Sequence, residues 1–373
     1  MPSEAVSPTV QVKSILNDYA LTEDYQAKAF GGGHVNDTFC ISIAGKALYL
    51  LQRINPDVFE NSAGVMRNHI AINERLSSIA KANPELGICL PELKKSRSGD
   101  YFHIDETGAY WRMVDFIEGS TTYDDTDCPK IAFQAANAFG EFQYFLHDLA
   151  LDSFEHTIPD FQNGEWRFKQ FEQALTLDSQ QRAELCSPSI DFALNNRELC
   201  CLFEEMKNAG KIHERVTHGD CKINNVLLSK QTSKALCVID LDTVMPGYSL
   251  YDFGDIVRTS TCTSPEDEAD LSKVMINLDL FEAVSRGYLE YAHKFLNDEE
   301  LEALALSGAC VSFMIGLRFL TDYLSGDKYF KTKHPNHNLE RAQAQFQLAK
   351  SILENQQPMQ EICSRLVNDY KQA

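Results

Sequence analysis

The first part of the chain is patterned as short strands. In residues 38–43 apolar and polar side chains alternate, and this period of two is typical of a strand. Residues 47–54 are predicted to form a second strand, which Asn55-Pro56 closes. Two further runs, 101–104 and 110–117, flank a Thr-Gly turn and are expected to be strands as well. Between these pairs, residues 65–80 repeat apolar positions at helical spacing, which predicts a helix.

Helical periods dominate the remainder of the chain. Apolar residues recur at helical spacing over six segments, namely 131–149, 166–175, 191–208, 280–295, 303–324 and 338–354. The most apolar stretch, 301–320, is interrupted by Glu302 and Arg318 and falls short of ~20 clean apolar residues, so we expect a buried helix and no membrane span. The change in pattern predicts an α+β fold of two lobes, 1–117 with an antiparallel sheet and 118–373 with mainly helices.

Composition and charge restrict the class of partner. With 373 residues, 44% hydrophobic and 24% charged, the chain has an ordinary globular composition. Its net charge of −20 argues against nucleic acid and against anionic membranes. The eleven cysteines are scattered, and residues 1–10 lack the basic start and apolar core of a signal peptide. We therefore expect a reduced, cytoplasmic protein that acts on a small molecule; the sequence does not indicate its oligomeric state.

The most informative motif is His218 to Asn225, which has the spacing H-x-D-x-x-x-x-N. A kinase catalytic loop has this spacing, and a metal-binding Asp follows it at the end of the next strand, where Asp240 stands here. Phosphoryl transfer needs one carboxylate near the attacking hydroxyl and oxygen ligands for Mg²⁺. We predict that Asp220 is the base and that Asn225 and Asp240 are metal ligands.

A simple turn is the alternative interpretation, because Asp and Asn are common in turns that precede a strand. The match, however, continues through the apolar run 235–239 into Asp240, and the segment 251–255 reads Tyr-Asp-Phe-Gly-Asp. This extended agreement favours the catalytic interpretation.

The same residues resemble the aminoglycoside phosphotransferase and choline kinase superfamily, in which the loop reads H-G-D. Within it, residues 238–247 and 251–255 are similar to the N-acetylhexosamine 1-kinase group of bacterial sugar kinases. The resemblance implies a two-lobed, protein-kinase-like fold and an ATP- and Mg²⁺-dependent kinase. It also implies that His218 is a structural hydrogen-bond partner and that Asp252 braces the catalytic loop.

Two segments are expected to bind the nucleotide. The Gly-rich stretch that includes Gly32, Gly33 and His34 lies between two predicted strands, so its backbone N–H groups can approach phosphates, although a Gly-rich hairpin alone is more often only a turn. In kinases the chain then passes a hinge, and the strand end at Asp115 and Ile117 should offer backbone groups to adenine.

A phosphate-binding cation is expected on the strand after the glycine loop. Gln52 stands where kinases usually have Lys, and Arg53 is beside it. We expect Arg53 to supply the charge, because a guanidinium can bind phosphate with two hydrogen bonds; a merely solvated Arg53 is the alternative. The acidic partner on the following helix stays open between Glu60 and Glu74.

The acceptor is expected to contact the helical lobe. Arg318 and Asp322 are four residues apart on one predicted helix, and they either bind sugar hydroxyls together with Asp37 or form an internal ion pair. Asp242, two residues after Asp240, is either a further metal ligand or a loop stabiliser.

We therefore predict a kinase that transfers the γ-phosphate of ATP to a sugar, at the anomeric hydroxyl of a hexose or N-acetylhexosamine. The alternatives are a kinase of another small alcohol, such as an aminoglycoside, choline, ethanolamine or homoserine, and a non-catalytic nucleotide-binding protein.

Overall fold

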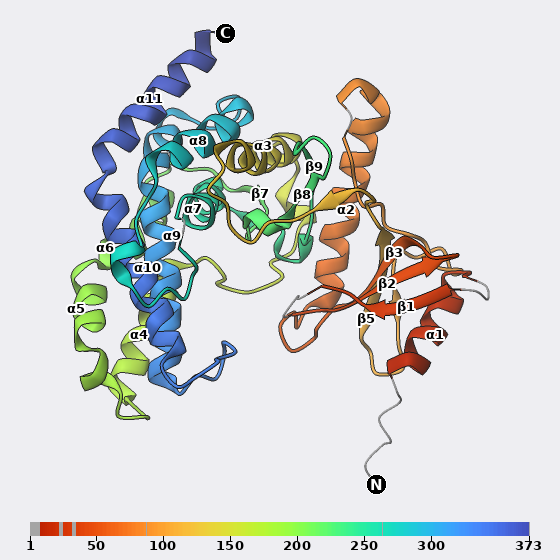
Figure 1. Ribbon diagram of the computed structural model, residues 1–373, viewed down its shortest axis with the longest axis horizontal. Coiled ribbons are helices and arrows are strands. Elements are labelled where there is room, and N and C mark those ends of the chain that lie inside the picture. The colour runs from red at the N-terminus through yellow and green to blue at the C-terminus, as the bar shows by residue number, and fades with distance from the viewer. Residues whose placement is uncertain (1–7, 22–24, 32–34, 87, 263, 373) are drawn as a thin grey trace.

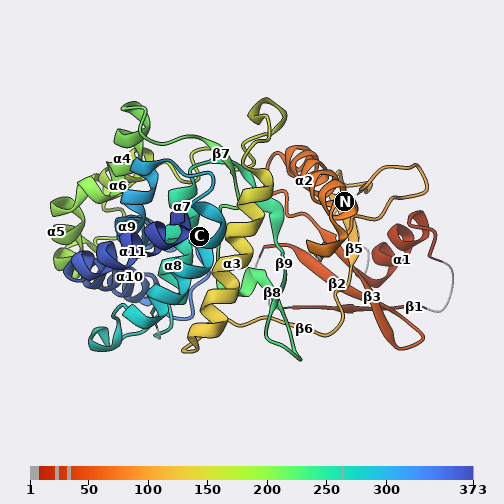
Figure 2. The ribbon, with the colours of Figure 1, turned by 90° about the horizontal axis from the view of Figure 1, so that it is seen from above.

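The computed structural model describes residues 8–21, 25–31, 35–86, 88–262 and 264–372. The N-terminal elements, coloured red to orange, gather around a sheet at one side of the molecule, and the helices of the C-terminal part gather at the other (Figure 1). The view from above shows the same separation, with helix α3 (Pro129–Leu146) lying between the sheet and the other helices of the C-terminal part (Figure 2).

Five antiparallel strands form the N-terminal sheet in the order β1-β2-β3-β5-β4. They are β1 (Tyr25–Ala29), β2 (Asp37–Ile43), β3 (Lys46–Arg53), β4 (His103–Ile104) and β5 (Tyr110–Asp115). In this register Gln52 of β3 lies directly opposite Arg112 of β5. A helix that the pattern did not predict, α1 (Pro8–Asp18), packs Ile15 and Leu16 into one core cluster with Trp111 of the sheet.

Helix α2 (Ser62–Ala82) connects the sheet to the helical part. Asn61 caps its N-terminus by accepting a hydrogen bond from the Gly64 N–H at 2.9 Å. Inside the helix, the buried Asn68 donates to the carbonyls of Glu155 and Val244 at 2.7 and 2.9 Å, and its Oδ1 accepts from the Glu155 N–H at 2.9 Å. All these partners lie far along the chain, so α2 is hydrogen-bonded directly to the helical part.

The C-terminal part consists mainly of packed helices. They are α3 (Pro129–Leu146), α4 (Gly164–Leu177), α5 (Ser187–Asn195), α6 (Arg197–Asn208), α7 (Ser249–Ser260), α8 (Leu278–Ala292), α9 (Asp298–Ser325), α10 (His337–Glu354) and α11 (Gln356–Gln372). The predicted helix 191–208 is two helices, since α5 ends at Asn195 and α6 begins at Arg197.

Helix α9 lies at the centre of this part and packs against α4, α7 and α10. Among the residues that the structure describes, α9 alone has the length and hydropathy of a membrane span, and 78% of its apolar window is buried inside the protein. It is thus the long core helix that the interrupted apolar stretch 301–320 predicted.

Short strands between α6 and α7 flank the H-G-D motif and Asp240. They are β7 (Arg215–Thr217), β8 (Val226–Ser229), β9 (Ala235–Val238) and β10 (Met245–Gly247), with β6 (Ser120–Thr121) pairing with β8 and β10 pairing with β7. The predicted class, an antiparallel sheet followed by a mainly helical part, is confirmed. The boundary between 117 and 118 stays a prediction.

Candidate active site

The H-G-D loop follows β7, and a buried carboxylate binds its backbone. Asp252 of α7 accepts from the backbone N–H of His218 at 2.7 Å and of Gly219 at 2.8 Å. The His218 ring makes edge contacts with Phe139 and Phe142 of α3, and its Nε2 donates to the Ile239 carbonyl at 3.0 Å. Both residues hold the loop by hydrogen bonds to backbone groups, so a proton-transfer role is not required of either.

Gly219 can only be glycine here for two reasons. Its φ is +82°, a conformation that other residues adopt at a cost, and a Cβ at this position would meet the Thr243 carbonyl oxygen at 2.7 Å. The close approach brings the catalytic loop against the turn that carries Asp240 and Asp242.

Asp220 projects from this loop with 25% of its side chain exposed. Its Oδ1 lies 2.8 Å from Nζ of Lys222, and its Oδ2 accepts from Nδ2 of Asn225 at 3.0 Å. Burial acts to raise the pKa of Asp220, but the charge and hydrogen bond of Lys222 outweigh it and hold this pKa below its usual value. Asp220 is therefore a carboxylate at neutral pH. Lys222 was not predicted from the sequence, although it stands two residues after Asp220.

Asp240 has the chemistry of a cation ligand. Burial first, and then the charges of Asp242 and Asp220, raise its pKa to about 6. The described contacts give it no ion pair with Lys, Arg or His, so a bound cation would relieve the repulsion among three neighbouring carboxylates. Asn225 uses its Nδ2 on Asp220, which leaves its Oδ1 as the atom to ligate a metal. One carboxylate, one amide oxygen and phosphate oxygens suit Mg²⁺.

The described residues contain no group of three or more His, Cys, Asp and Glu side chains that could hold a metal by themselves. A metal held by Asp240 and Asn225 would thus depend on the phosphates of a bound nucleotide for its remaining ligands.

The strand before Asp240 ends earlier than the sequence suggested. Strand β9 stops at Val238, Asp240 is left-handed with φ 63°, and Leu241 to Thr243 form a 3₁₀ turn. Asp240 and Asp242 are therefore not alternate residues of one strand. Asp242 is 1% exposed; it forms an ion pair with Arg112 through Oδ1 and accepts from Asn36 through Oδ2, so both of its oxygens are occupied.

Arg112 is a buried cation that contacts the turn after Asp240, and sequence reasoning missed it. It is 1% exposed, and besides its bond to Asp242 its Nε donates to Oε1 of Gln52 at 3.0 Å. Its Nη1 also lies 3.0 Å from Nδ1 of His69 in α2. Burial and the Arg112 charge lower the pKa of His69 to about 3, so its ring is neutral and can accept from the guanidinium.

The two residues proposed at the end of β3 have different surroundings. Gln52 also donates to Thr38 Oγ1 at 3.3 Å, whereas Arg53 forms a partly exposed ion pair with Asp37 at 3.4 Å. Glu60 and Glu74, the two candidates for an acidic partner, are both exposed. The α2 side chain that reaches the buried cation is His69 instead.

The other nucleotide-side predictions are placed only in part. Gly32, Gly33 and His34 lie outside the described residues. Asp115 ends β5 and pairs with Lys94 at 2.6 Å, while the Ile117 carbonyl accepts from Ser120 Oγ at 2.6 Å.

Arg318 and Asp322 do not pair with each other in the described contacts. Asp322 is buried at the end of α9, where its carboxylate accepts three consecutive backbone N–H groups of residues 328–330, each at 2.9 Å, and Nδ2 of Asn338 at 3.0 Å. These bonds fix the loop that follows α9. Asp37, the third acceptor-side candidate, is on β2 at the sheet, paired with Arg53.

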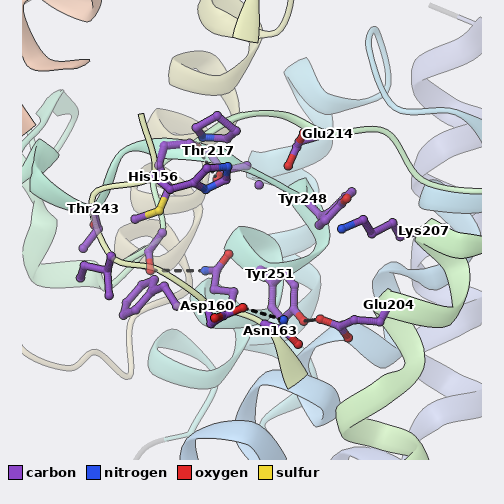
Figure 3. A pocket seen from close by; sticks show the side chains of 17 residues that line it. His156, Asp160, Asn163, Glu204, Lys207, Glu214, Thr217, Thr243, Tyr248 and Tyr251 are labelled. Atoms are coloured by element: carbon purple, nitrogen blue, oxygen red, sulfur yellow. Dashed lines mark hydrogen bonds between the residues drawn. The ribbon is translucent and has the colours of Figure 1, made fainter. Parts of the chain in front are cut away.

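A pocket of about 180 Å³ opens beside the catalytic loop (Figure 3). Thr243 and His156 lie at one end, and Glu204, Lys207 and Tyr248 lie at the opposite end. Its lining also includes Gly219, Thr217, Asp160, Phe161, Gln162, Asn163, Glu214 and Tyr251. Carboxylates, amides, hydroxyls and one ammonium group therefore surround a space that is also lined by Gly219, the residue before Asp220.

Residues 26–284 match the phosphotransferase enzyme family. The chain is similar in structure to an aminoglycoside phosphotransferase from Alicyclobacillus acidocaldarius, with a TM-score of 0.64, 13% sequence identity and coverage of 99% of each chain.

Two further solved structures are similar to this chain. One is a microcompartment-associated aminopropanol kinase, with a TM-score of 0.59, 13% identity and coverage of 94% of this chain and 98% of that chain. The other is an amicoumacin kinase in complex with AMP-PNP and Ca²⁺, with a TM-score of 0.57, 13% identity and coverage of 94% of both chains. At these identities the likeness shows the fold, and the predicted kinase-like fold is confirmed.

Proposed function

This chain belongs to the phosphotransferase enzyme family, and we propose that it transfers the γ-phosphate of ATP to a hydroxyl group of a sugar. The observation that carries this proposal is the grouping of Asp220, Lys222, Asn225 and Asp240 around one loop. A base, a cation and two metal ligands are the groups that phosphoryl transfer requires at one place.

Asp220 would orient the acceptor hydroxyl and take its proton. The acceptor reacts through a loose transition state, in which little proton transfer has to precede bond formation, so a carboxylate of low pKa is adequate and positioning matters more. Lys222 lies 2.8 Å from the same carboxylate and can neutralise charge that develops on the transferred phosphoryl group.

Asp240 and Oδ1 of Asn225 would hold the metal. Mg²⁺ held by these residues would supply positive charge that neutralises the charge of the phosphates. The similarity to a kinase solved with AMP-PNP and Ca²⁺ supports a nucleotide and a divalent metal as the cofactors. Arg53, partly exposed at the end of β3, is our candidate for an outer phosphate contact.

A hexose or N-acetylhexosamine, phosphorylated at its anomeric hydroxyl, is the acceptor that we propose. The supporting observations are the sequence likeness of 238–247 to sugar 1-kinases and the pocket beside the catalytic loop, whose Asp160, Asn163, Thr217 and Tyr248 offer the mixed donors and acceptors that a ring of hydroxyls needs. The cytoplasmic location expected from the sequence is compatible with this assignment.

The test is coupled ADP release over a panel of hexoses, N-acetylhexosamines, aminoglycosides, choline, ethanolamine, aminopropanol and homoserine. We expect turnover of a sugar by the wild type, and a loss of kcat of ~10²–10⁴-fold in Asp220→Asn with ATP affinity retained. Asp148→Asn, which alters an exposed carboxylate paired with Arg75, is the matched control and should keep full activity.

Two results would contradict the proposal. Full turnover by Asp220→Asn would remove Asp220 from the base role. Turnover restricted to amines or amino alcohols would overturn the sugar assignment and leave the phosphotransferase assignment standing.

A further inference from the structure

The arginines of this protein fall into two groups. The fully buried ones have carboxylate partners: Arg112 pairs with Asp242, Arg215 with Glu300, and Arg258 with Asp255 and Glu266. In the described part of the chain, three half-buried arginines have no ion pair with a carboxylate, namely Arg167, Arg318 and Arg341. Removing charge from water without a partner is costly, so these three need an explanation.

Arg341 is explained by the fold. It lies over the ring of Phe319 and donates to the Lys331 carbonyl at 3.2 Å, so it holds the loop after α9. Arg167 and Arg318 remain, and both contact the same residue. The Arg318 guanidinium lies 5.5 Å from the ring of Phe161, and Nη2 of Arg167 donates to the Phe161 carbonyl at 3.0 Å.

Aromatic rings surround the Arg318 guanidinium. Tyr329 and Phe330, from the loop that Asp322 fixes, lie 5.8 and 5.6 Å from it, in addition to Phe161. Arg167 lies 4.7 Å from the ring of Trp166. Stacking on rings orients a guanidinium and leaves the N–H groups at the edge of its plane able to donate. Arg167 uses part of this edge within the protein, because Nε and Nη2 donate to the Phe161 carbonyl and Nη1 donates to Oε1 of Gln170 at 3.2 Å.

The two positive charges act on each other. Burial first, and then the charge of Arg318, lower the pKa of Arg167 to about 10. The nearby acids are Asp160, which is exposed and acts on Arg167, and the catalytic Asp220, which acts on Arg318. Neither forms an ion pair with the arginines in the described contacts. An anion between the two guanidinium groups would relieve this repulsion.

The arginine pair is connected to the reaction centre. Phe161 lines the pocket beside the catalytic loop, and the next residue, Gln162, donates to the Gly219 carbonyl at 3.4 Å. Gly219 precedes Asp220, whose charge is felt by Arg318. A molecule bound in this pocket would therefore contact Phe161, the residue that both arginines contact.

We propose that the acceptor carries an anionic group, a carboxylate or a phosphate, which Arg167 and Arg318 bind while Asp220 receives a hydroxyl of the same molecule. The inference rests on the proposed function and refines it, because it selects acidic derivatives of hexoses over neutral hexoses and over amines. Arginine suits this task because its planar fork can bind a carboxylate or a phosphate through two hydrogen bonds. A cationic acceptor would meet two like charges.

The test compares sugars that differ from glucose at one carbon. Glucose, glucuronate and glucose 6-phosphate all keep the anomeric hydroxyl, and the two acids separate a carboxylate from a phosphate. We expect one acid to have the highest kcat/KM. Arg318→Met should lower kcat/KM for that acid by about 10- to 100-fold and for glucose by less than about threefold, since a hydrogen bond to a charged group is lost only with the acid.

Further variants control for folding and for charge. Arg167→Met should repeat the selective loss, and Arg318→Lys should restore only part of the activity on the acid, because it keeps the charge and loses the fork. Arg286→Met, which alters an exposed arginine paired with Glu282, should leave kcat/KM unchanged for both the acid and glucose. An equal loss on acid and neutral sugar in the Arg318 variants would overturn the proposal, because it would show that Arg318 acts on the transferred phosphoryl group instead.

Calorimetry without nucleotide separates this inference from the proposed function. Binding of glucuronate or glucose 6-phosphate to the wild type, lost in Arg318→Met and kept in Arg286→Met, would support the anion subsite even if no sugar were phosphorylated. Absence of binding of both acids to the wild type would overturn the inference, and turnover of neutral sugars in the same preparation would leave the proposed function intact.

Discussion

The ion pair between Arg112 and Asp242 should be among the most sensitive points of the fold. It joins strand β5 to the turn that carries Asp240, and the two side chains are only 2% and 1% exposed. Removing one partner of such a pair leaves the other charge buried and uncompensated, which typically costs about 3–5 kcal/mol. In Asp242→Ala the Arg112 guanidinium would retain only the neutral acceptors of Gln52 and His69.

An exposed pair provides the comparison. Arg75 and Asp148 lie 2.6 Å apart with 33% and 54% of their side chains exposed, and such surface pairs contribute about 0–1 kcal/mol. Asp242→Ala should therefore destabilise the protein by several kcal/mol more than Asp148→Ala does. The double variant Arg112→Met with Asp242→Leu should lose less than the two single changes together, because it leaves no buried charge.

Urea unfolding is the assay, followed by circular dichroism and by tryptophan fluorescence. Trp111 is buried next to Arg112 and reports on the sheet, whereas Trp166 on α4 reports on the helical part. A cost for Asp242→Ala within about 1 kcal/mol of that for Asp148→Ala would refute the reasoning. So would strict additivity in the double variant, since additivity is expected only of independent sites.

Three other predictions concern the site. Burial, and then the charges of Asp242 and Asp220, raise the pKa of Asp240 to about 6, so the contribution of this carboxyl to the stability of the metal-free fold should fall as the pH rises from about 4 to 6. Unfolding at each pH in EDTA should therefore give a more positive slope of stability against pH in Asp240→Asn than in the wild type, and equal slopes would contradict the assignment. Arg53→Ala should raise KM for ATP more than Gln52→Ala does. The reverse ranking would assign the phosphate contact to Gln52 or to a Lys elsewhere. Asp322→Ala should lower acceptor affinity and speed proteolysis of the loop after α9, since it releases three backbone N–H groups; unchanged protection would contradict its anchoring role.

The parts that could be predicted from sequence are those with local signals. The H-x-D-x-x-x-x-N spacing places Asp220 and Asn225 within one short loop, and their contact at 3.0 Å depends on few other residues. Long periodic helices such as α9 were likewise foreseen. The break between α5 and α6 was not, because the apolar period runs on through Asn196.

The parts that could not be predicted depend on contacts distant in sequence. Arg112 reaches Asp242 across 130 positions, and only the pairing of β3 with β5 shows that it occupies the neighbourhood of Gln52. The role of Asp322 could not be predicted either. Its partners are backbone N–H groups, which every residue except proline has, so the residue types in the loop do not reveal them. Its spacing to Arg318 suggested a side-chain pair, whereas the loop beyond α9 uses the carboxylate instead.

The hydrogen bonds of Asn68 bear on how the molecule can move. Since this side chain ties α2 to the backbone of Glu155 and to that of Val244, which follows the turn that carries Asp242, α2 should move with the C-terminal helices and not with the sheet to which it is adjacent in sequence. Closure over a nucleotide would then be a rotation of the five-stranded sheet against a fixed α2, on the microsecond to millisecond timescale of such hinge motions. The relative displacement would then be largest at contacts between the sheet and α2. The contact between Arg112 of β5 and His69 of α2 is one of these, so the Arg112 guanidinium would link the moving sheet to the stationary helix.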